Sequence, residues 1–178
     1  MIIVEGPDNA GKSTFAAKIG LQVRHPGPAP INDFELNLCL HDQMIAMREP
    51  IVLDRVSCIS HQVYNEGWFN SGVLWQYLNE FIKSKHVIFV YCRPPESQLM
   101  NFAHHKAKDY DTEAHIQRVI DNQATFIRRY DELFSKIPHI AYDFTDAELS
   151  KSHIIRELVH FAHGQPSTIK DHLIGGRT

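Results

Sequence analysis

Hydrophobic residues occur along the chain in two patterns, short unbroken runs and longer stretches with a helical spacing. The short runs predict buried strands at Ile2–Glu5, Ile51–Leu53, Val87–Tyr91 and Ile140–Phe144. The periodic stretches predict helices over Ser13–Val23, Leu36–Arg48, Ser71–Ser84, Glu96–Phe102, Glu113–Lys136 and Glu148–His163. Strands that alternate with helices indicate βαβ units. We therefore expect an α/β fold with a mainly parallel sheet flanked by helices on both faces.

Polar or proline-rich segments interrupt this pattern. His25–Pro30 contains three prolines, which fix φ and remove hydrogen-bond donors, so neither an ordinary helix nor a central strand is expected there. His104–Thr112 is polar and charged. The residues after Gly164 are also polar, and we expect a loose tail at 164–178. The length of 178 residues suits one domain, spanning 1–178.

Composition narrows the class of protein. With 43% hydrophobic residues and a net charge of −3, the chain is typical of a globular protein and not of one that binds nucleic acid without specificity. No apolar stretch is long enough to predict a membrane-spanning helix, and the first residues do not match a signal peptide. Three scattered cysteines predict reduced thiols, which favours a cytoplasmic protein.

The strongest motif lies between the first predicted strand and the first predicted helix. Gly6–Ser13 matches GxxxxGK[ST], a phosphate-binding loop of the P-loop NTPase fold. In such loops the backbone N–H groups and the helix N-terminus face the phosphates. We expect Lys12 to reach the β- and γ-phosphates of ATP and the Ser13 hydroxyl to bind Mg²⁺. The predicted nucleotide-binding residues of the loop are Gly6, Asn9, Ala10, Gly11, Lys12, Ser13 and Thr14.

A phosphate loop predicts a nucleotide and leaves the reaction open. The sequence has no NKxD-type guanine motif, which counts against a GTPase. Motor and translocating ATPases are normally larger than this chain. A small chain with a basic segment late in the sequence favours phosphoryl transfer to a small acceptor.

Further motifs resemble one family. The loop EGPDNAGKST, the strand end Leu53-Asp54-Arg55, and then Ser60 and Tyr64 resemble thymidylate kinases and the related phage-type deoxynucleotide kinases. Those proteins have an EGxDxAGKS/T loop, a Pro-Gly loop after the first helix, and a DR motif followed by Ser and an aromatic residue. The resemblance follows most of the chain in order and implies an ATP- and Mg²⁺-dependent kinase with a small lid.

The resemblance implies a role for each matching residue. Asp8 would meet the 3′-hydroxyl of the acceptor deoxyribose, Asp54 would lie near Mg²⁺ or the acceptor phosphate, and Arg55 would bind that phosphate. Together with Lys12, these three are the expected catalytic residues, and Ser13 and Asp54 the expected metal ligands. The alternatives are a helix cap for Asp8 and a surface ion pair for Asp54 with Arg55.

The resemblance also implies an acceptor loop and a lid. Pro26 and Gly27 match the acceptor loop, or form only a rigid turn. The lid would span about residues 104–113, where Lys106 and Lys108 would neutralise charge on the ATP phosphates, unless they only form a solvated face. Family members supply an arginine from the loop or the lid. Here the loop has Asn9, so Arg93 or Arg118 would have to substitute.

Aromatic residues leave the acceptor base undetermined. Phe34 is not in the family's usual base-binding arrangement, and it suits the core better than a stacking platform. Another aromatic group lies after the DR motif. It could line a base pocket, or belong to the core or a dimer face: Trp68, Phe69, Trp75 and Tyr77.

The sequence therefore predicts a deoxynucleoside monophosphate kinase that resembles thymidylate kinase, uses ATP and Mg²⁺, and acts on a small nucleotide acceptor. One alternative is a kinase with a hydroxyl acceptor, either a deoxynucleoside or 5-hydroxymethyluracil in phage DNA, with Asp54 or Asp8 as general base. Another is a non-catalytic nucleotide-binding regulatory protein. The resemblance implies a homodimer and fits a bacterial or phage source, hence the cytoplasm of a bacterium or infected host, with no membrane partner.

Overall fold

The computed structural model describes residues 1–25, 33–64, 71–101, 113–146 and 150–175. At its centre lies a five-stranded sheet in the order β2-β3-β1-β4-β5. All neighbouring strands in it pair in parallel, so the prediction of an α/β fold is confirmed. The strands are β1 (Ile2–Glu5), β2 (Gln22–Arg24), β3 (Ile51–Asp54), β4 (Ile88–Cys92) and β5 (His139–Tyr142).

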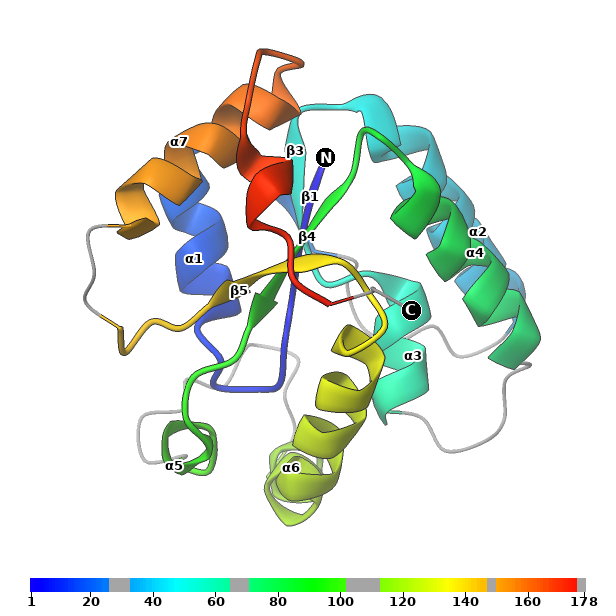
Figure 1. The fold of residues 1–178 in the computed structure, drawn as a ribbon. Coiled ribbons are helices and arrows are strands. Elements are labelled where there is room, and N and C mark those ends of the chain that lie inside the picture. The colour runs from blue at the N-terminus through cyan, green and yellow to red at the C-terminus, as the bar shows by residue number, and fades with distance from the viewer. Residues whose placement is uncertain (26–32, 65–70, 102–112, 147–149, 176–178) are drawn as a thin grey trace.

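Helices cover both faces of the sheet, with α1 and α7 on one side and α2, α3 and α4 on the other (Figure 1). The α-helices are α1 (Lys12–Ile19), α2 (Asp33–Ile45), α3 (Ser57–Tyr64), α4 (Ser71–Lys83), α5 (Glu96–Leu99), α6 (Glu113–Phe134) and α7 (Ser150–Ala162). Two short 3₁₀ helices, η1 (Ala46–Arg48) and η2 (Ile169–His172), follow α2 and α7. No helix within the described ranges is long and apolar enough to cross a membrane.

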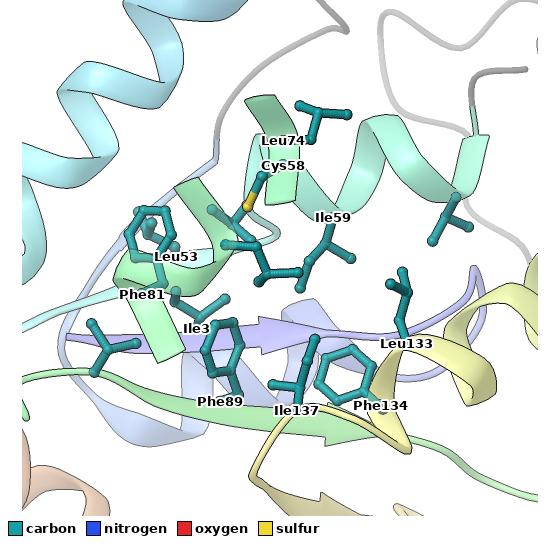
Figure 2. Close-up of a cluster of buried hydrophobic side chains, with 14 of the residues drawn as sticks. Ile3, Leu53, Cys58, Ile59, Leu74, Phe81, Phe89, Leu133, Phe134 and Ile137 are labelled. Atoms are coloured by element: carbon teal, nitrogen blue, oxygen red, sulfur yellow. The ribbon is translucent and has the colours of Figure 1, made fainter. Parts of the chain in front are cut away.

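Alternating side chains of the strands build two cores. Ile3, Leu53 and Phe89 face α2, α3, α4 and α6, and Figure 2 shows them packed with Phe81 and Phe134. The opposite side chains of the same strands pack against α1 and α7 in a second cluster. Because both faces are covered, the central strands are apolar at nearly every position, which is why they appear as unbroken runs in the sequence.

The chain just after the first helix differs from the prediction of one helix over Ser13–Val23. The helix ends at Ile19 because Gly20 adopts a left-handed conformation (φ 75°) and caps it. Gln22–Arg24 then forms the edge strand β2, which pairs with β3. The eight-residue helix α3 after the DR motif was also not predicted.

The expected loose tail is wrong for residues 164–175. The Ile169 side chain is fully buried in the core that includes α1 and α7. Ile174 pairs with His139 of β5, donating its N–H to the His139 carbonyl at 2.8 Å and accepting from the His139 N–H at 2.9 Å. The sequence does not predict these contacts, because the segment is mostly polar and only a few apolar residues attach it to the core.

Candidate active site

Backbone conformation shapes the loop between β1 and α1. Gly6, Asn9 and Gly11 all have positive φ angles, of 147°, 62° and 76°. A Cβ atom on Gly6 would lie 2.4 Å from the Cys92 carbonyl oxygen at the end of β4. A Cβ on Gly11 would lie 2.9 Å from the Phe144 ring. The turn therefore requires glycine at both positions, and it leads directly into α1, whose first-turn N–H groups have no partner within the helix.

Replacing Gly6 with alanine tests this packing. We expect Gly6→Ala to lower the free energy of unfolding by at least about 3 kcal/mol, because it adds a collision with Cys92 to an unfavourable φ. Gly20→Ala is the matched control, since Gly20 also has a positive φ but has open space around the added Cβ. It should cost about 1 kcal/mol. Urea unfolding measures both values, and equal losses would contradict the close approach.

Lys12 and Ser13 begin α1 beneath this loop. The Lys12 side chain is buried, and its Nζ donates to the Pro7 carbonyl at 2.6 Å. Burial, followed by the nearby Arg55 charge, lowers the pKa of Lys12 to about 8. Ser13 Oγ donates to Asp54 Oδ2 at 2.6 Å. Ser13 and Asp54, the two expected metal ligands, therefore lie in contact at the carboxyl ends of β1 and β3.

The donor set at Ser13 and Asp54 fits Mg²⁺. This ion prefers oxygen ligands and commonly takes one or two from the protein, the others coming from phosphates and water. A hydroxyl and a buried carboxylate in mutual contact match that requirement. In the described part of the chain, no group of three or more His, Cys, Asp or Glu side chains is arranged to hold a metal.

A second group surrounds Arg55, directly after β3. Its Nη2 donates to Asp8 Oδ1 at 2.8 Å, and its Nη1 donates to the Tyr64 and Tyr130 hydroxyls at 2.9 and 2.7 Å. Tyr64 donates in turn to Asp8 Oδ2 at 2.9 Å. Arg55 has a positive φ of 82°, an unusual conformation outside glycine, and its N–H donates to Val4 of β1. The guanidinium is thereby fixed beside the phosphate loop.

Glu5 lies beneath this group and is fully buried. Its Oε1 accepts the Val56 N–H at 2.6 Å, and its Oε2 accepts the Tyr130 hydroxyl at 3.1 Å. Burial raises the pKa of Glu5 to about 7, although Arg55 and these hydrogen bonds act in the opposite direction. Glu5 therefore holds the Tyr130 hydroxyl and the backbone next to Arg55 in place. Whenever Glu5 is ionised, its burial makes the fold less stable.

This cost predicts a pH dependence of stability. The folded pKa of about 7 exceeds the ordinary value of 4.5, so the stabilising contribution is complete below about pH 4.5 and is lost as the pH rises through 7. Between these limits we expect wild type to lose about 3 kcal/mol relative to Glu5→Gln, which keeps the oxygen acceptor and cannot ionise. Urea unfolding of both proteins from pH 4.5 to 8 measures the difference. Parallel stability curves would contradict a raised pKa.

The alternatives for Asp8, Asp54 and Arg55 fail. Asp8 is not the helix cap, because Gly11 occupies that position and makes no side-chain cap. Asp54 and Arg55 do not pair with each other in a surface ion pair. Arg55 binds Asp8, whereas the buried Asp54 binds Ser13 and lies 3.2 Å from Nδ1 of His25.

The proposed substitutes for the missing loop arginine are engaged elsewhere. Arg93 donates to both carboxylate oxygens of Asp131, at 2.9 and 3.0 Å. Arg118 donates to the Tyr64 carbonyl at 2.9 Å. Asn9, at the loop position itself, donates to the Asn101 carbonyl at 3.2 Å.

Other predictions cannot be compared with the structure. Residues 104–112 of the expected lid at about 104–113, with Lys106 and Lys108, lie outside the described residues, whereas Glu113 begins α6. The Pro26-Gly27 loop, Trp68, Phe69 and the Phe34 side chain also lie outside them. Trp75 and Tyr77 are partly buried against the core shared by α2, α3 and α4, in agreement with the core interpretation.

Sequence reasoning missed several side chains of the site. Tyr130 comes from α6, far along the chain from the motifs, and joins Arg55 to Glu5. Gln123, also on α6, is fully buried and donates to the backbone carbonyls of Asp8 and Leu99 at 2.9 and 3.2 Å. No local pattern marks either residue. Glu5 is the first residue of the EGPDNAGKST motif, and its two accepted hydrogen bonds explain the need for a carboxylate at this position.

Comparisons with known proteins bear on the fold. No protein-family model matches this sequence, and no curated protein matches it. Among solved structures, the chain is similar to the YorR protein from Bacillus subtilis in complex with phosphorylated GDP. The TM-score is 0.65 at 20% identity, with 93% of this chain and 98% of that chain covered. This likeness gives no specific support to thymidylate kinases. It shows that the chain has an α/β fold of the P-loop NTPase type, a parallel sheet flanked by helices.

Proposed function

We propose that the protein is an ATP- and Mg²⁺-dependent kinase that phosphorylates a deoxynucleoside monophosphate. The observation that carries this proposal is the position of Arg55. Its guanidinium is hydrogen-bonded to Asp8, which lies in the same loop as Lys12 and Ser13, the residues that would bind the phosphate donor. A fixed planar cation next to a phosphate loop suits a second phosphate group, that of the acceptor.

On the donor side, the chain binds and orients the triphosphate. The positive φ angles of the loop turn its backbone N–H groups inward, and the N-terminus of α1 adds partial positive charge. Lys12 Nζ, which donates to the Pro7 carbonyl, would turn to the phosphate oxygens, and Ser13 and Asp54 would hold the ion. Mg²⁺ bound there would neutralise charge on the phosphates. Lys106 and Lys108 would add positive charge from the lid.

On the acceptor side, Arg55 would bind the monophosphate through its Nε–H and the second hydrogen of Nη2, because both hydrogens of Nη1 go to the two tyrosines. Asp8 would accept the sugar hydroxyl. The Tyr64 and Tyr130 hydroxyls, which accept from Arg55, prevent rotation of the guanidinium. The reaction then requires positioning and charge neutralisation, because a phosphate oxygen is already a charged nucleophile.

The geometry favours a phosphate acceptor over a hydroxyl acceptor. A hydroxyl needs a general base with an accessible oxygen. Each Asp8 oxygen already accepts a hydrogen bond, from Arg55 or Tyr64. Asp54 is 4% exposed, and its Oδ2 accepts from Ser13. Both carboxylates therefore serve better as ligands and orienting groups than as bases.

The test is ADP release from Mg-ATP with a panel of acceptors. The panel holds each common dNMP and NMP, each deoxynucleoside, and DNA that contains 5-hydroxymethyluracil. GMP and dGMP belong in it because the similar YorR structure holds a guanine nucleotide. Turnover with one or two monophosphates supports the proposal. Turnover only with DNA or nucleosides would establish a hydroxyl acceptor, and ATP binding without turnover would establish a regulatory protein.

A further inference from the structure

A separate cavity lies at the opposite end of the sheet from the phosphate loop. Its volume is about 650 Å³, and its lining includes Met1, Pro50 and His86, which come just before β1, β3 and β4. In a parallel sheet these amino ends lie on the edge away from the loop that follows Glu5. Figure 1 shows this separation, with the chain's N-terminus at one end of β1 and the loop to α1 at the other.

The lining is strongly basic. Arg48, Lys85, His86, His163 and Lys170 all contribute to it, and none of the described residues that line it is Asp or Glu. We call this feature the basic groove. Elements far apart in sequence supply these side chains, namely η1, the turn before β4, the end of α7 and η2.

Contacts within the basic groove fix its two sides together. Lys170 Nζ donates to the Lys85 carbonyl at 3.3 Å. The same Nζ lies 5.6 Å from the centre of the Phe161 ring, which is half-buried and forms an apolar part of the wall. Cationic side chains and one aromatic surface therefore face the same space.

The charges of the basic groove repel one another. The pKa of His86 lies below its ordinary value, through partial desolvation and then through the positive charges of Lys85 and Arg48. An anion bound among these groups would remove that repulsion and form charge-assisted hydrogen bonds. The volume lies within the range of about 300–1,000 Å³ that is usual for small-molecule sites.

We propose that the basic groove is a second anion site, which binds a small polyphosphate-bearing molecule of the nucleotide class. Arg48 and Lys85 supply the phosphate contacts from one side, and Lys170 supplies them from the other. Phe161 provides the apolar surface against which a sugar or base packs. The site is independent of the phosphate loop, so it stands whether or not the proposed kinase activity does.

Calorimetric titration of the full chain tests the proposal, with inorganic triphosphate and ATP as separate probes in Mg²⁺-free buffer. We expect Lys85→Glu and Arg48→Glu each to weaken one binding event by more than about tenfold, the value of one charge-assisted hydrogen bond. Lys12→Ala should leave that event intact. Tighter binding of ATP than of triphosphate supports the proposal, because the nucleoside then adds to the affinity. Equal affinity for the two probes would assign binding to the phosphates alone and would overturn the nucleotide class of the ligand.

Lys83→Glu is the matched control. Lys83 is exposed near Lys85, carries the same charge and does not line the groove. If Lys83→Glu and Lys85→Glu weaken probe binding equally, the effect comes from the net charge of the protein alone, and the proposal is overturned. A single binding event that disappears in Lys12→Ala would also overturn it. So would binding of duplex DNA at the groove with neither small probe bound, since the site would then serve a macromolecule.

Discussion

Lys12→Ala should lower kcat by about a thousandfold or more while the protein remains folded. Lys12 is the first residue of α1, and its buried Nζ donates to the Pro7 carbonyl of the phosphate loop. Burial lowers the pKa of this ammonium group to about 8, so its removal relieves an electrostatic cost. We therefore expect stability at pH 7 to be unchanged or raised, and kinetics and urea unfolding together measure the two effects.

Lys18→Ala is the control for this substitution. Lys18 lies on the same helix, is exposed, and is the basic residue of its last turn. Its loss removes the same charge without touching the loop, so turnover should stay within about twofold of wild type, since exposed substitutions have small effects. Full activity in Lys12→Ala would refute the assignment of the phosphate loop as the donor site.

Arg55→Lys should raise KM for the acceptor by at least about tenfold, because lysine keeps the charge and loses the fixed planar pair of donors. It should also destabilise the fold by about 1–3 kcal/mol, since a single ammonium cannot satisfy Asp8, Tyr64 and Tyr130 in the geometry that the guanidinium allows. Initial rates at varied acceptor concentration, with ATP saturating, measure the first effect, and KM for ATP should change little.

Arg129→Lys serves as the matched substitution. Arg129 lies on α6 and donates to the Val63 carbonyl at 2.7 Å, a hydrogen bond that joins α6 to α3. It should lower stability to a similar degree and leave KM for the acceptor unchanged. If both variants raise that KM equally, Arg55 acts through general destabilisation and does not contact the acceptor.

The central strands and long helices could be predicted because their apolar residues follow the period of a covered sheet or of an amphipathic helix. Strand β2 could not, since Gln22 and Arg24 are exposed at the sheet edge and carry no apolar signal. Strand β2 forms only because its backbone pairs with β3. Helix α3 also lacks a clear hydrophobic period, because its buried face includes the polar residues Ser57 and His61 as well as apolar ones.

Some residues of the candidate site could likewise be predicted from the sequence, and others could not. Gly6, Lys12 and Ser13 are recognisable because a local turn and a helix start determine their chemistry. Asp54 and Arg55 follow a strand, so their position at the carboxyl edge of the sheet could be expected from the order of elements. Tyr130 and Gln123 could not be predicted. Which turn of α6 reaches the loop depends on how the helix docks on the sheet, and that depends on the whole core.

The contact of Gly6 with Cys92 has a consequence for the time at which the phosphate loop acquires its shape. Gly6 comes far earlier in the chain than β4, yet the carbonyl against which it packs belongs to the last residue of β4. β1 also lies between β3 and β4 and needs both as neighbours. A nascent chain that ends before β4 therefore has the complete GxxxxGK[ST] motif in its sequence but lacks the folded shape of the loop. Nucleotide offered during translation should protect the chain from proteolysis only after β4 has left the ribosome.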